Sequence, residues 1–424
     1  MQVVVVALGK IGLPLAVAVA RAGHEVIGCD VDQRVVELVN AGREPFPGES
    51  GLAQALAEVA GDGRLRAVTD TTAAVAEGPE LVIAVPPLIV DADARPDWRI
   101  LDSVLADIGA GLQAGTTVSI ETTLPVGSTR ERVAPALEDG SGLIAEEDFF
   151  TVFSPERVFS GRIFEDLETY PKLVGGLSED GERRGCRLYG AFITAPVWSM
   201  GSAEAAELTK LAETTYRDIN IAFANELVRM ADGRGLDAQR VIDAANSQPF
   251  SHIHRPGIAV GGHCIPVYPR FYLEGDPGAA LPRAAREVNE AMPLYAVQRL
   301  AEALGGSLAG TRVLILGVSY RGGVKETAFS GAFGVRDALA GAGAIPVAVD
   351  PLYDAAEIEA LGFTHWDGGA VDAAIVQADH EQYAALDAQT IPGARAVLDG
   401  RGIVSDEAFA GSAVALVRLG RPPA

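Results

Sequence analysis

The chain is poor in cysteine, in basic residues and in long apolar runs, and each scarcity excludes a class of protein. Its three cysteines in 424 residues lie more than seventy positions apart, so they provide neither a disulfide framework nor CxxC metal spacing. Lys and Arg number 34 against 57 Asp and Glu, and the formal net charge of −23 disfavours sequence-independent binding of nucleic acid. No apolar run approaches the roughly twenty residues of a membrane span. We therefore expect no metal site, no nucleic-acid partner and no membrane partner.

Apolar side chains are abundant enough for sizeable cores. Hydrophobic residues make up 48% of the chain, and its length allows two or three domains. The first residues predict a strand where a secretory signal would need a basic region, so we expect a cytoplasmic protein.

The N-terminal stretch predicts a strand, a turn, a helix and a second strand that ends in an acid. Residues 3–6 form the first strand, and the turn 7–12 matches a GxGxxG motif with Ala7 in place of the first glycine. The second strand, 24–29, ends at Asp30, which is 23 residues after Ala7. In such a unit the turn amides and the helix N-terminus face a pyrophosphate. The acid accepts hydrogen bonds from a ribose diol, which favours NAD over NADP.

Two further strands end at residues that cannot continue a sheet, and a third follows them. The strand 81–85 ends at two prolines, 117–121 ends in the stretch 122–125 that closes with Pro125, and 149–153 leads into 154–158. Ligands bind at strand ends in open parallel sheets, so Thr123 is a candidate site hydroxyl, although it could simply end a strand. The candidate NAD contacts are Gly9, Lys10, Ile11, Gly12, Asp30, Arg34, Pro86 and Thr123.

Residues 203–232 change to a helical period. The apolar set of this helix is Leu208, Leu211, Ile219, Phe223, Leu227 and Met230. Lys210, Thr214 and Arg217 share one face, which is either a solvent-exposed stripe or directed into a site. A second long helix is expected over 283–304, kinked at Pro293.

Residues 256–269 contain three glycines and three prolines, which predict a shaped loop in place of a regular helix or strand. Cys264 lies at its centre. A single cysteine is commonly a small buried apolar residue. The glycine-rich surroundings and the adjacent His263 favour a loop that holds a reactive thiol.

The C-terminal third repeats the plan of the N-terminal one and predicts a second Rossmann-like lobe. A strand over 312–316 precedes the turn 317–322, in which a serine replaces the second glycine and Arg321 is added. Such a turn fits a nucleoside diphosphate bound partly by side-chain charge. Arg401 offers another cation at a strand end, although either arginine could be a solvated surface residue.

A dinucleotide turn combined with a loop thiol indicates a particular reaction. An aldehyde made by hydride removal cannot readily lose a second hydride until a nucleophile makes its carbon tetrahedral, and a thiolate does this well. Cys264 would be the nucleophile, favoured as a thiolate by a cation such as Lys210. Lys210 could also stabilise the alkoxide, while Thr123 and Glu156 position water and assist its deprotonation.

Along nearly its whole length the sequence resembles the nucleotide-sugar 6-dehydrogenases, the family of UDP-glucose and UDP-N-acetylmannosamine dehydrogenases. The matching stretches are LGKIGLP (8–14), ETTLPVG (121–127), SPERV (154–158), Lys210 with YRDINIA (216–222), GGHCIP (261–266) and DGR (399–401). The resemblance implies an α/β fold of two Rossmann-like doubly wound lobes joined by a central helical region. It places an NAD-binding domain at 1–198, a dimerising and catalytic region at 199–304 and a UDP-binding domain at 305–424.

The resemblance also implies an activity in polysaccharide biosynthesis: four-electron oxidation of the C6 hydroxyl of a UDP-hexose to the uronic acid through a Cys264 thioester, in a homodimer. The sequence around Arg157 and Cys264 resembles the family members that act on N-acetylated sugars more than those that act on UDP-glucose. By match, the substrate contacts are Arg157, Val158, Lys210, Thr214, Arg217, Arg255, Gly261, Tyr320, Arg321 and Arg401. The family usually has Asn at Thr214, Asp at Tyr268 and Arg at Ala328.

Two other functions fit the residues. One is a single-step alcohol dehydrogenase in which Cys264 is a spectator. The other is a binding protein for NAD and a UDP-sugar that performs no chemistry.

Overall fold

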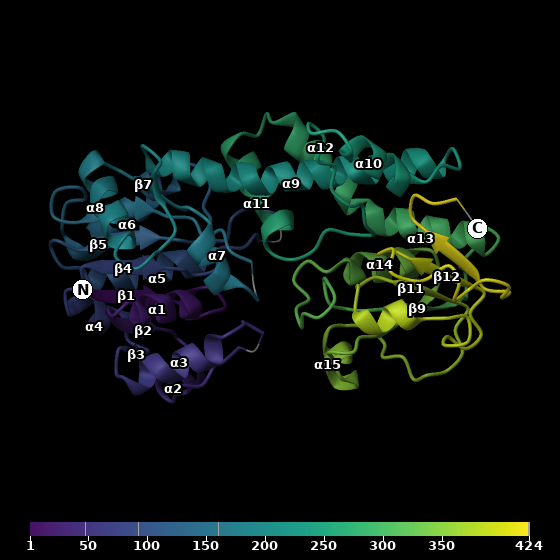
Figure 1. The fold of residues 1–424 in the computed structure, drawn as a ribbon, viewed down its shortest axis with the longest axis horizontal. Coiled ribbons are helices and arrows are strands. Elements are labelled where there is room, and N and C mark those ends of the chain that lie inside the picture. Colours follow the sequence, from purple (N-terminus) through teal and green to yellow (C-terminus); the bar gives the residue numbers. More distant parts are fainter. Residues whose placement is uncertain (47, 92, 160, 423–424) are drawn as a thin grey trace. The chain divides into compact units, whose positions relative to one another are not determined.

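The structure, a computed structural model, describes residues 1–46, 48–91, 93–159 and 161–422 (Figure 1). It divides into two compact units, each described separately here. Unit 1 comprises residues 1–213 and 274–276, and unit 2 comprises residues 214–273 and 277–424. Figure 1 colours the chain from purple at the N-terminus to yellow at the C-terminus.

Unit 1 is built on an eight-stranded sheet in the order β3-β2-β1-β4-β5-β6-β7-β8. The strands are β1 (Gln2–Val6), β2 (Glu25–Cys29), β3 (Leu65–Val68), β4 (Leu81–Ala84), β5 (Thr117–Ile120), β6 (Phe150–Phe153), β7 (Lys172–Gly176) and β8 (Val197–Ser199). Every neighbouring pair is parallel except β6 with β7. The order reverses between β1 and β4, so ligands are expected at the carboxyl ends of these two strands.

Helices follow the strands of unit 1 as crossovers. They are α1 (Gly12–Arg21), α2 (Gln33–Asn40), α3 (Leu52–Gly61), α4 (Thr71–Ala76), α5 (Arg99–Gly111), the π-helix η1 (Thr129–Val133), α6 (Ala134–Ser141), α7 (Ile163–Thr169) and α8 (Glu179–Tyr189). The 30-residue α9 (Ala203–Asp232) begins in unit 1 and ends in unit 2.

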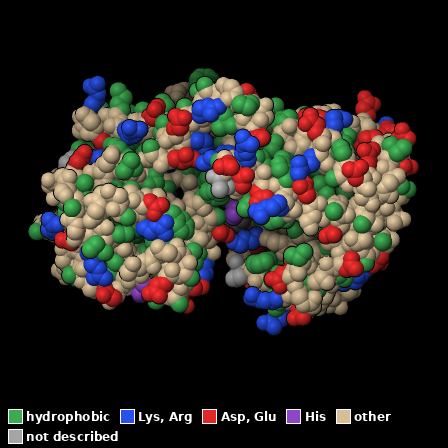
Figure 2. All heavy atoms as spheres, turned by 180° about the vertical axis from the view of Figure 1, so that it is seen from behind, with side chains coloured by type: hydrophobic (Ala, Val, Ile, Leu, Met, Phe, Trp, Pro, Cys, Tyr) green, Lys and Arg blue, Asp and Glu red, His purple; other side chains and the backbone are tan. Residues whose placement is uncertain are grey.

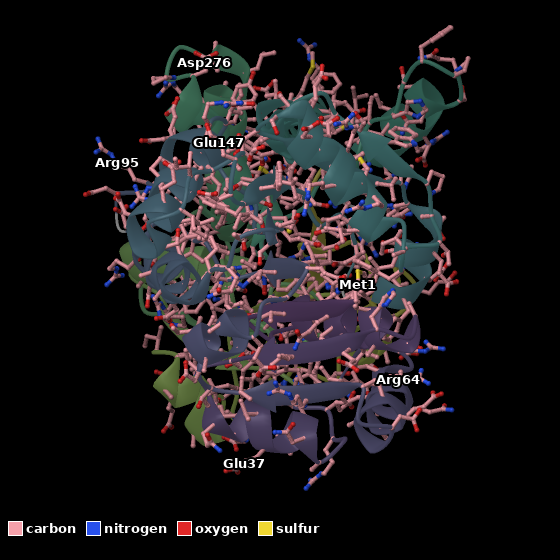
Figure 3. All side chains as sticks on the ribbon, turned by 90° about the vertical axis from the view of Figure 1, so that its left-hand side faces the viewer. Met1, Glu37, Arg64, Arg95, Glu147 and Asp276 are labelled. Atoms are coloured by element: carbon pink, nitrogen blue, oxygen red, sulfur yellow. The ribbon has the colours of Figure 1, made fainter. Side chains whose placement is uncertain are left out.

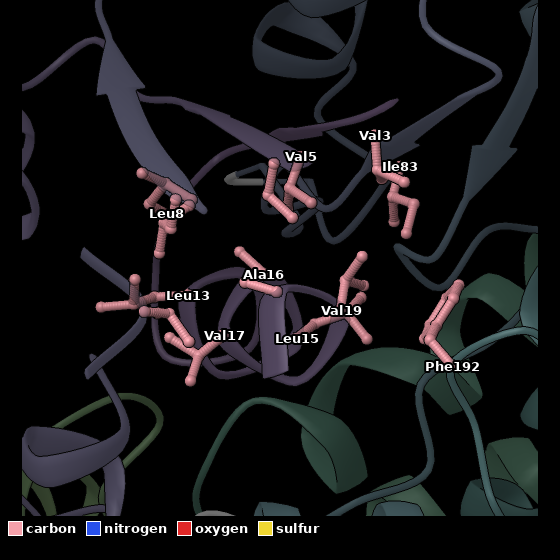
Figure 4. Packing of buried hydrophobic residues seen from close by; sticks show 14 of the residues in the cluster. Val3, Val5, Leu8, Leu13, Leu15, Ala16, Val17, Val19, Ile83 and Phe192 are labelled. Carbon is pink, nitrogen blue, oxygen red and sulfur yellow. The ribbon is translucent and has the colours of Figure 1, made fainter. Parts of the chain in front are cut away.

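The core of unit 1 lies between β1 and α1. Side chains of Leu13, Ala16 and Val19 from α1 pack beneath Val5 and Ile83 of β1 and β4 (Figure 4). All five are fully buried. The small alanines of α1 let the helix approach the sheet closely, and this fixes the N-terminus of α1 beside the end of β1.

Unit 2 contains a five-stranded parallel sheet in the order β10-β9-β11-β12-β13. Its strands are β9 (Arg312–Leu316), β10 (Ile345–Val349), β11 (Ala373–Val376), β12 (Ala396–Asp399) and β13 (Ala415–Arg418). Its remaining helices are α10 (Ala238–Asn246), α11 (Cys264–Gly275), α12 (Ala280–Glu290), α13 (Met292–Ala303), α14 (Gly331–Gly341), α15 (Ala355–Ala360) and the 3-10 helix η2 (Glu381–Ala385). Together the two sheets confirm the predicted α/β class with two Rossmann-like lobes and intervening helices.

Two sequence-based expectations were wrong. The single kinked helix over 283–304 is two helices, α12 and α13, which meet at Ala291, and Pro293 lies in the first turn of α13. The predicted cysteine loop ends earlier than expected, because Cys264 is the first residue of α11. Pro266 fits there because amides in a first helical turn have no intrahelical acceptor.

The surface carries most of the charge. Acidic side chains are spread over the face shown in Figure 2. Figure 3 shows Glu37, Arg64 and Arg95 at the edges of the view, and all three are exposed. Within the described ranges, no helix is both long and apolar enough to cross a bilayer.

Candidate active site

The turn after β1 is held by the acid at the end of β2. The Asp30 carboxylate accepts hydrogen bonds from the backbone N–H of Leu8 at 2.8 Å and from that of Asp32 at 2.9 Å. Ala7 adopts a left-handed conformation with φ of 74°, which turns the chain sharply away from the sheet. Asp30 stays partly exposed, so its carboxylate can also accept hydrogen bonds from a ligand.

Two glycines of this turn have different surroundings. A Cβ at Gly12 would lie 2.0 Å from the carbonyl oxygen of Ala7, so only glycine fits between the turn and α1. A Cβ at Gly9 would meet no atom within 4 Å, so the backbone there is open to a ligand. An open glycine turn before a helix N-terminus, with an acid at the next strand end, fits the pyrophosphate and ribose of NAD.

The other predicted cofactor contacts lie around this edge of unit 1. Lys10 is exposed, Ile11 is half-buried directly before α1, and Arg34 is exposed in the first turn of α2. The carbonyl of Pro86, after β4, accepts a hydrogen bond from the hydroxyl of Thr122, after β5. This bond joins the ends of two neighbouring strands.

Thr123 is buried, and a buried carboxylate of α9 holds the turn that follows it. Glu207 accepts hydrogen bonds from the N–H of Gly127 at 2.6 Å, the N–H of Thr129 at 2.8 Å and the hydroxyl of Thr129 at 2.6 Å. Burial raises the pKa of Glu207 to about 7, against the opposing effect of these donors. Thr123 therefore lies buried just before a turn that Glu207 holds in place.

The loop after β6 brings several predicted residues together. The Glu156 carboxylate accepts the N–H of Arg157 at 2.6 Å and that of Val158 at 3.2 Å. Its backbone carbonyl accepts a hydrogen bond from Lys210 Nζ at 2.5 Å. Arg157 Nε donates to Glu213 at 2.7 Å. Glu156, Arg157, Val158 and Lys210 thus form one cluster in unit 1.

The face of α9 that carries Lys210 is buried. Lys210 is 8% exposed, Thr214 is 4% exposed and Arg217 is half-buried. The alternative of a solvent-exposed stripe is therefore wrong for this face. Burial, followed by the Arg217 charge, lowers the pKa of His254.

Cys264 lies in unit 2, at the start of α11, with an exposed thiol. The preceding loop packs on the C-terminal lobe: Gly262 N–H donates to the Ala328 carbonyl at 2.9 Å, and Ile258 N–H donates to Gly400 at 3.2 Å. A Cβ at Gly261 would lie 2.7 Å from Cβ of Tyr320, so glycine is required where the loop crosses the turn after β9.

Asparagines of α9 hold the segment before the cysteine loop. Asn220 donates to the His252 carbonyl at 2.6 Å and accepts from His254 N–H at 2.9 Å. Asn225 accepts from Gly257 N–H at 3.0 Å. Arg255, predicted to bind substrate, lies exposed on this segment.

Arg401 links three parts of the second lobe. Its guanidinium donates to the carbonyls of Gln377 at 2.5 Å and Tyr320 at 3.0 Å. Burial lowers the pKa of Arg401, and Asp379 opposes that shift. No carboxylate of the described residues lies within ion-pair distance of Arg401. Arg321 lies over the Tyr320 ring, 5.6 Å from its centroid, and its buried Nε has no described partner.

The acid at the end of β10 differs from Asp30 in its surroundings. Asp350 is 2% exposed and accepts hydrogen bonds from the N–H groups of Val318 at 2.8 Å, Ser319 at 2.9 Å and Leu352 at 2.9 Å. His380 Nε2 lies 3.2 Å from the same carboxylate. Asp350 is thus buried and engaged by its own turn, whereas Asp30 stays partly exposed to a ligand.

Sequence reasoning missed the buried charged residues that brace these segments. They are Glu121, Lys172, Glu207, Asp218 and Arg286. The one available signal was Glu121 at a strand end; the others occupy helices and a strand edge where charge is ordinarily exposed. The predicted catalytic residues themselves fall in both units: Thr123, Glu156 and Lys210 in unit 1, and Cys264 in unit 2.

Comparison with known proteins gives a consistent result. Residues 1–193, 204–291 and 314–406 match the NAD-binding, central and UDP-binding domains of the UDP-glucose/GDP-mannose dehydrogenase family. The chain is 32% identical to the UDP-N-acetyl-D-mannosamine dehydrogenase of Pyrococcus horikoshii, over 96% of each chain. It is also 32% identical to an NDP-N-acetyl-D-galactosaminuronic acid dehydrogenase of Ralstonia nicotianae, over 96% of this chain and 97% of the relative.

Solved structures agree. The Pyrococcus horikoshii UDP-D-ManNAc dehydrogenase superposes with a TM-score of 0.89 at 30% identity, covering 100% of both chains. A UDP-glucose dehydrogenase from Pyrobaculum islandicum gives 0.84 at 28% identity, covering 96% of this chain and 98% of that one. With its NAD-binding turn, its central helices and its UDP-binding lobe in the same order, the chain belongs to the UDP-glucose/GDP-mannose dehydrogenase family.

Proposed function

We propose that the protein is an NAD-dependent dehydrogenase that oxidises the C6 hydroxyl of an N-acetylated UDP-hexose to the uronic acid. The observation that carries this proposal is the order of the family domains, NAD-binding, central and UDP-binding, along the whole chain. Relatives named for N-acetyl-D-mannosamine and N-acetyl-D-galactosaminuronic acid favour an N-acetylated sugar over glucose, and we propose UDP-N-acetylmannosamine or UDP-N-acetylglucosamine. We place the enzyme in the cytoplasm and in polysaccharide biosynthesis.

Bound NAD supplies the hydride acceptor for each of two oxidations. The Cys264 thiolate adds to the aldehyde carbon formed in the first, and so makes that carbon tetrahedral again. Loss of a second hydride and of the hydroxyl proton turns this thiohemiacetal into a thioester, and water hydrolyses the thioester to the uronate and the free thiol. Lys210 stabilises the alkoxide, while Glu156 and Thr123 position water and assist its deprotonation.

Charge and backbone shape support the assignment of substrate contacts. Arg401, which donates to backbone carbonyls, and Arg321, whose buried Nε has no described partner, provide cations for a diphosphate beside the ring of Tyr320. The residues that we assign to the sugar are Arg157, Val158, Lys210, Thr214, Arg217, Arg255 and Gly261.

The test is a panel of UDP-sugars, including UDP-glucose, assayed for reduced nicotinamide. We expect an N-acetylated sugar to be preferred, with two NADH formed per sugar consumed. Cys264→Ser should abolish the second oxidation, whereas Cys186→Ser, at a half-buried cysteine of α8, should not. One NADH per sugar, with full turnover in Cys264→Ser, would indicate the single-step enzyme. Binding of both ligands without turnover would indicate a binding protein.

We further propose three domains, at 1–198, 199–304 and 305–424, and a homodimer formed through the central helices. Tyr216, Phe223 and Met230 recur every seven residues on α9 and are 55%, 49% and 60% exposed in the single chain. Such an apolar stripe favours burial against a second copy. Light scattering should give a dimer for the native chain and a monomer for Phe223→Glu.

A further inference from the structure

A buried lysine contacts the candidate base of unit 1. Lys172, the first residue of β7, is 5% exposed. Its Nζ lies 2.6 Å from Oε2 of Glu121 and 3.1 Å from Oε2 of Glu156. A buried ammonium is costly unless carboxylates surround it, so these two contacts explain its burial.

The far side of this cluster is closed. Tyr189 donates its hydroxyl hydrogen to Oε1 of Glu121 at 2.5 Å, and the hydroxyl of Ser119 lies 2.7 Å from that of Tyr189. The Tyr189 ring centroid lies 5.1 Å from Lys172 Nζ. Both oxygens of Glu121 therefore have a hydrogen-bond partner, and Glu121 and the Tyr189 ring hold Lys172 in position.

Three hydrogen-bond donors hold the Glu156 carboxylate. Lys172 occupies Oε2, while the N–H groups of Arg157 and Val158 occupy Oε1. The other charged groups nearby are engaged elsewhere: Lys210 Nζ meets the Glu156 backbone carbonyl, and the Arg157 guanidinium pairs with Glu213. On α7, Asp166 accepts from Arg162 at 2.7 Å. Lys172 is thus a buried cation in direct contact with the Glu156 carboxylate.

We propose that Lys172 is a positioning residue for the reaction, a buried counter-charge that keeps the Glu156 carboxylate ionised and oriented, with Glu121 and Tyr189 fixing Lys172 in place. This inference rests on the proposed role of Glu156. It assigns no proton transfer to Lys172 itself.

The direction of the pKa shifts agrees with this role. Burial acts to raise the pKa of Glu156, but Lys172 and the Arg157 N–H outweigh it and hold the pKa below its ordinary value. Burial raises the pKa of Glu121 to about 7, against the opposing charge of Lys172. Burial acts to lower the pKa of Lys172, and the two carboxylates reverse that effect. Without the lysine, the backbone N–H donors would remain to oppose the effect of burial on the pKa of Glu156.

The first experiment compares Lys172→Met with Lys172→Arg. For the methionine variant we expect kcat near neutral pH to fall about 10- to 100-fold, with KM for NAD and UDP-sugar changed less than about threefold. The acid limb of its kcat profile should move to higher pH by about one unit or more. Lys172→Arg should keep the limb. A folded Lys172→Met enzyme with an unchanged acid limb would overturn the proposal.

A second pair of variants controls for misfolding and separates the proposed role of Lys172 from that of Glu156. Glu121→Gln/Lys172→Met removes one carboxylate with the cation, so Glu156 does not face a second buried charge; we expect the same shifted limb. If Glu156→Gln retains full activity, the proposed role of Glu156 fails. If Glu156→Gln is inactive but neither Lys172→Met nor the double variant moves the acid limb, only the role of Lys172 fails.

A readout independent of turnover completes the test. Infrared difference spectra between mildly alkaline and mildly acidic solution, with Glu156→Gln as the blank, report protonation of the Glu156 carboxylate. Protonation at higher pH in Lys172→Met than in the native protein is expected. Identical titration of the carboxylate in both proteins would contradict the inference.

Discussion

Arg286 of α12 donates two hydrogen bonds of 2.8 Å to the carboxylate of Asp218 on α9, one from Nε and one from Nη2. Both side chains are buried. Asn289 donates to the same carboxylate at 2.7 Å and accepts from Asn225 at 2.8 Å. Asn225 in turn accepts from the N–H of Gly257, so the ion pair is linked through amides to the backbone of the cysteine loop.

Removing Arg286 should destabilise this part of unit 2 strongly. In Arg286→Met the Asp218 carboxylate stays buried without its cation, which typically costs about 3–5 kcal/mol. Urea denaturation should report that loss. The control is Arg183→Met. Arg183 pairs with Asp180, and the two side chains are 74% and 66% exposed, so this pair should contribute less than about 1 kcal/mol to the free energy of unfolding. Equal losses in both variants would contradict this reading of the network.

Alanine substitutions at the two turn glycines should separate cofactor binding from folding. Gly9→Ala adds a methyl group in open space, so the melting temperature should hold while KM for NAD rises about tenfold, or about 1.4 kcal/mol. Gly12→Ala places a methyl group against the Ala7 carbonyl and should destabilise unit 1 by about 1–3 kcal/mol. Unchanged NAD affinity in Gly9→Ala would show that the open backbone is not used.

Glu207 should make stability depend on pH in the neutral range. Its pKa is raised from 4.5 to about 7 in the folded state. The folded chain therefore holds a proton that the unfolded chain has lost, and this stabilisation, complete below pH 4.5, disappears as pH rises through about 7. Between about pH 5 and pH 8 the native protein should lose up to about 3 kcal/mol relative to Glu207→Gln. The exposed Glu147→Gln should follow the native curve in urea denaturation.

Arg401 should matter more for UDP than for folding. Arg401→Met removes a cation that has no carboxylate partner in the described ranges, so calorimetry should show UDP affinity reduced about 10- to 100-fold. Arg395→Met, at an exposed arginine at the start of β12, is the matched control and should bind UDP normally. Similar losses in both variants would point to a general charge effect.

Elements with a strong local signal were predictable. The apolar period gave α9 its bounds at 203–232, and β9 was predicted at 312–316. Asp30 was found because a βαβ unit fixes its separation from the turn. Glu156 and Lys210 were predicted from motifs, and the structure places the carbonyl of one against the ammonium of the other.

The braces around these residues were not predictable from local pattern. Lys172 meets Glu121 across 51 positions, Thr129 meets Glu207 across 78, and Arg286 meets Asp218 across 68. Nothing in the neighbouring sequence distinguishes such a charged residue from a solvated one, because its burial depends on how distant elements pack. The start of α11 was missed for a different reason. Proline density signals a loop, yet Pro266 lies in the first helical turn, which tolerates proline, and Pro269 lies inside the helix.

The buried carboxylate of Asp350 bears on how NADH is exchanged for NAD between the two oxidations. The second lobe repeats the strand, turn and terminal acid of the first, but its acid is buried, accepts hydrogen bonds from its own turn and lies against His380. We therefore expect the dinucleotide at the turn after β1, where Asp30 is partly exposed. On the proposed function, the first NADH must dissociate and a second NAD must bind while the half-oxidised sugar remains bound to the protein. Retention of that sugar therefore determines whether the acid or the aldehyde is released.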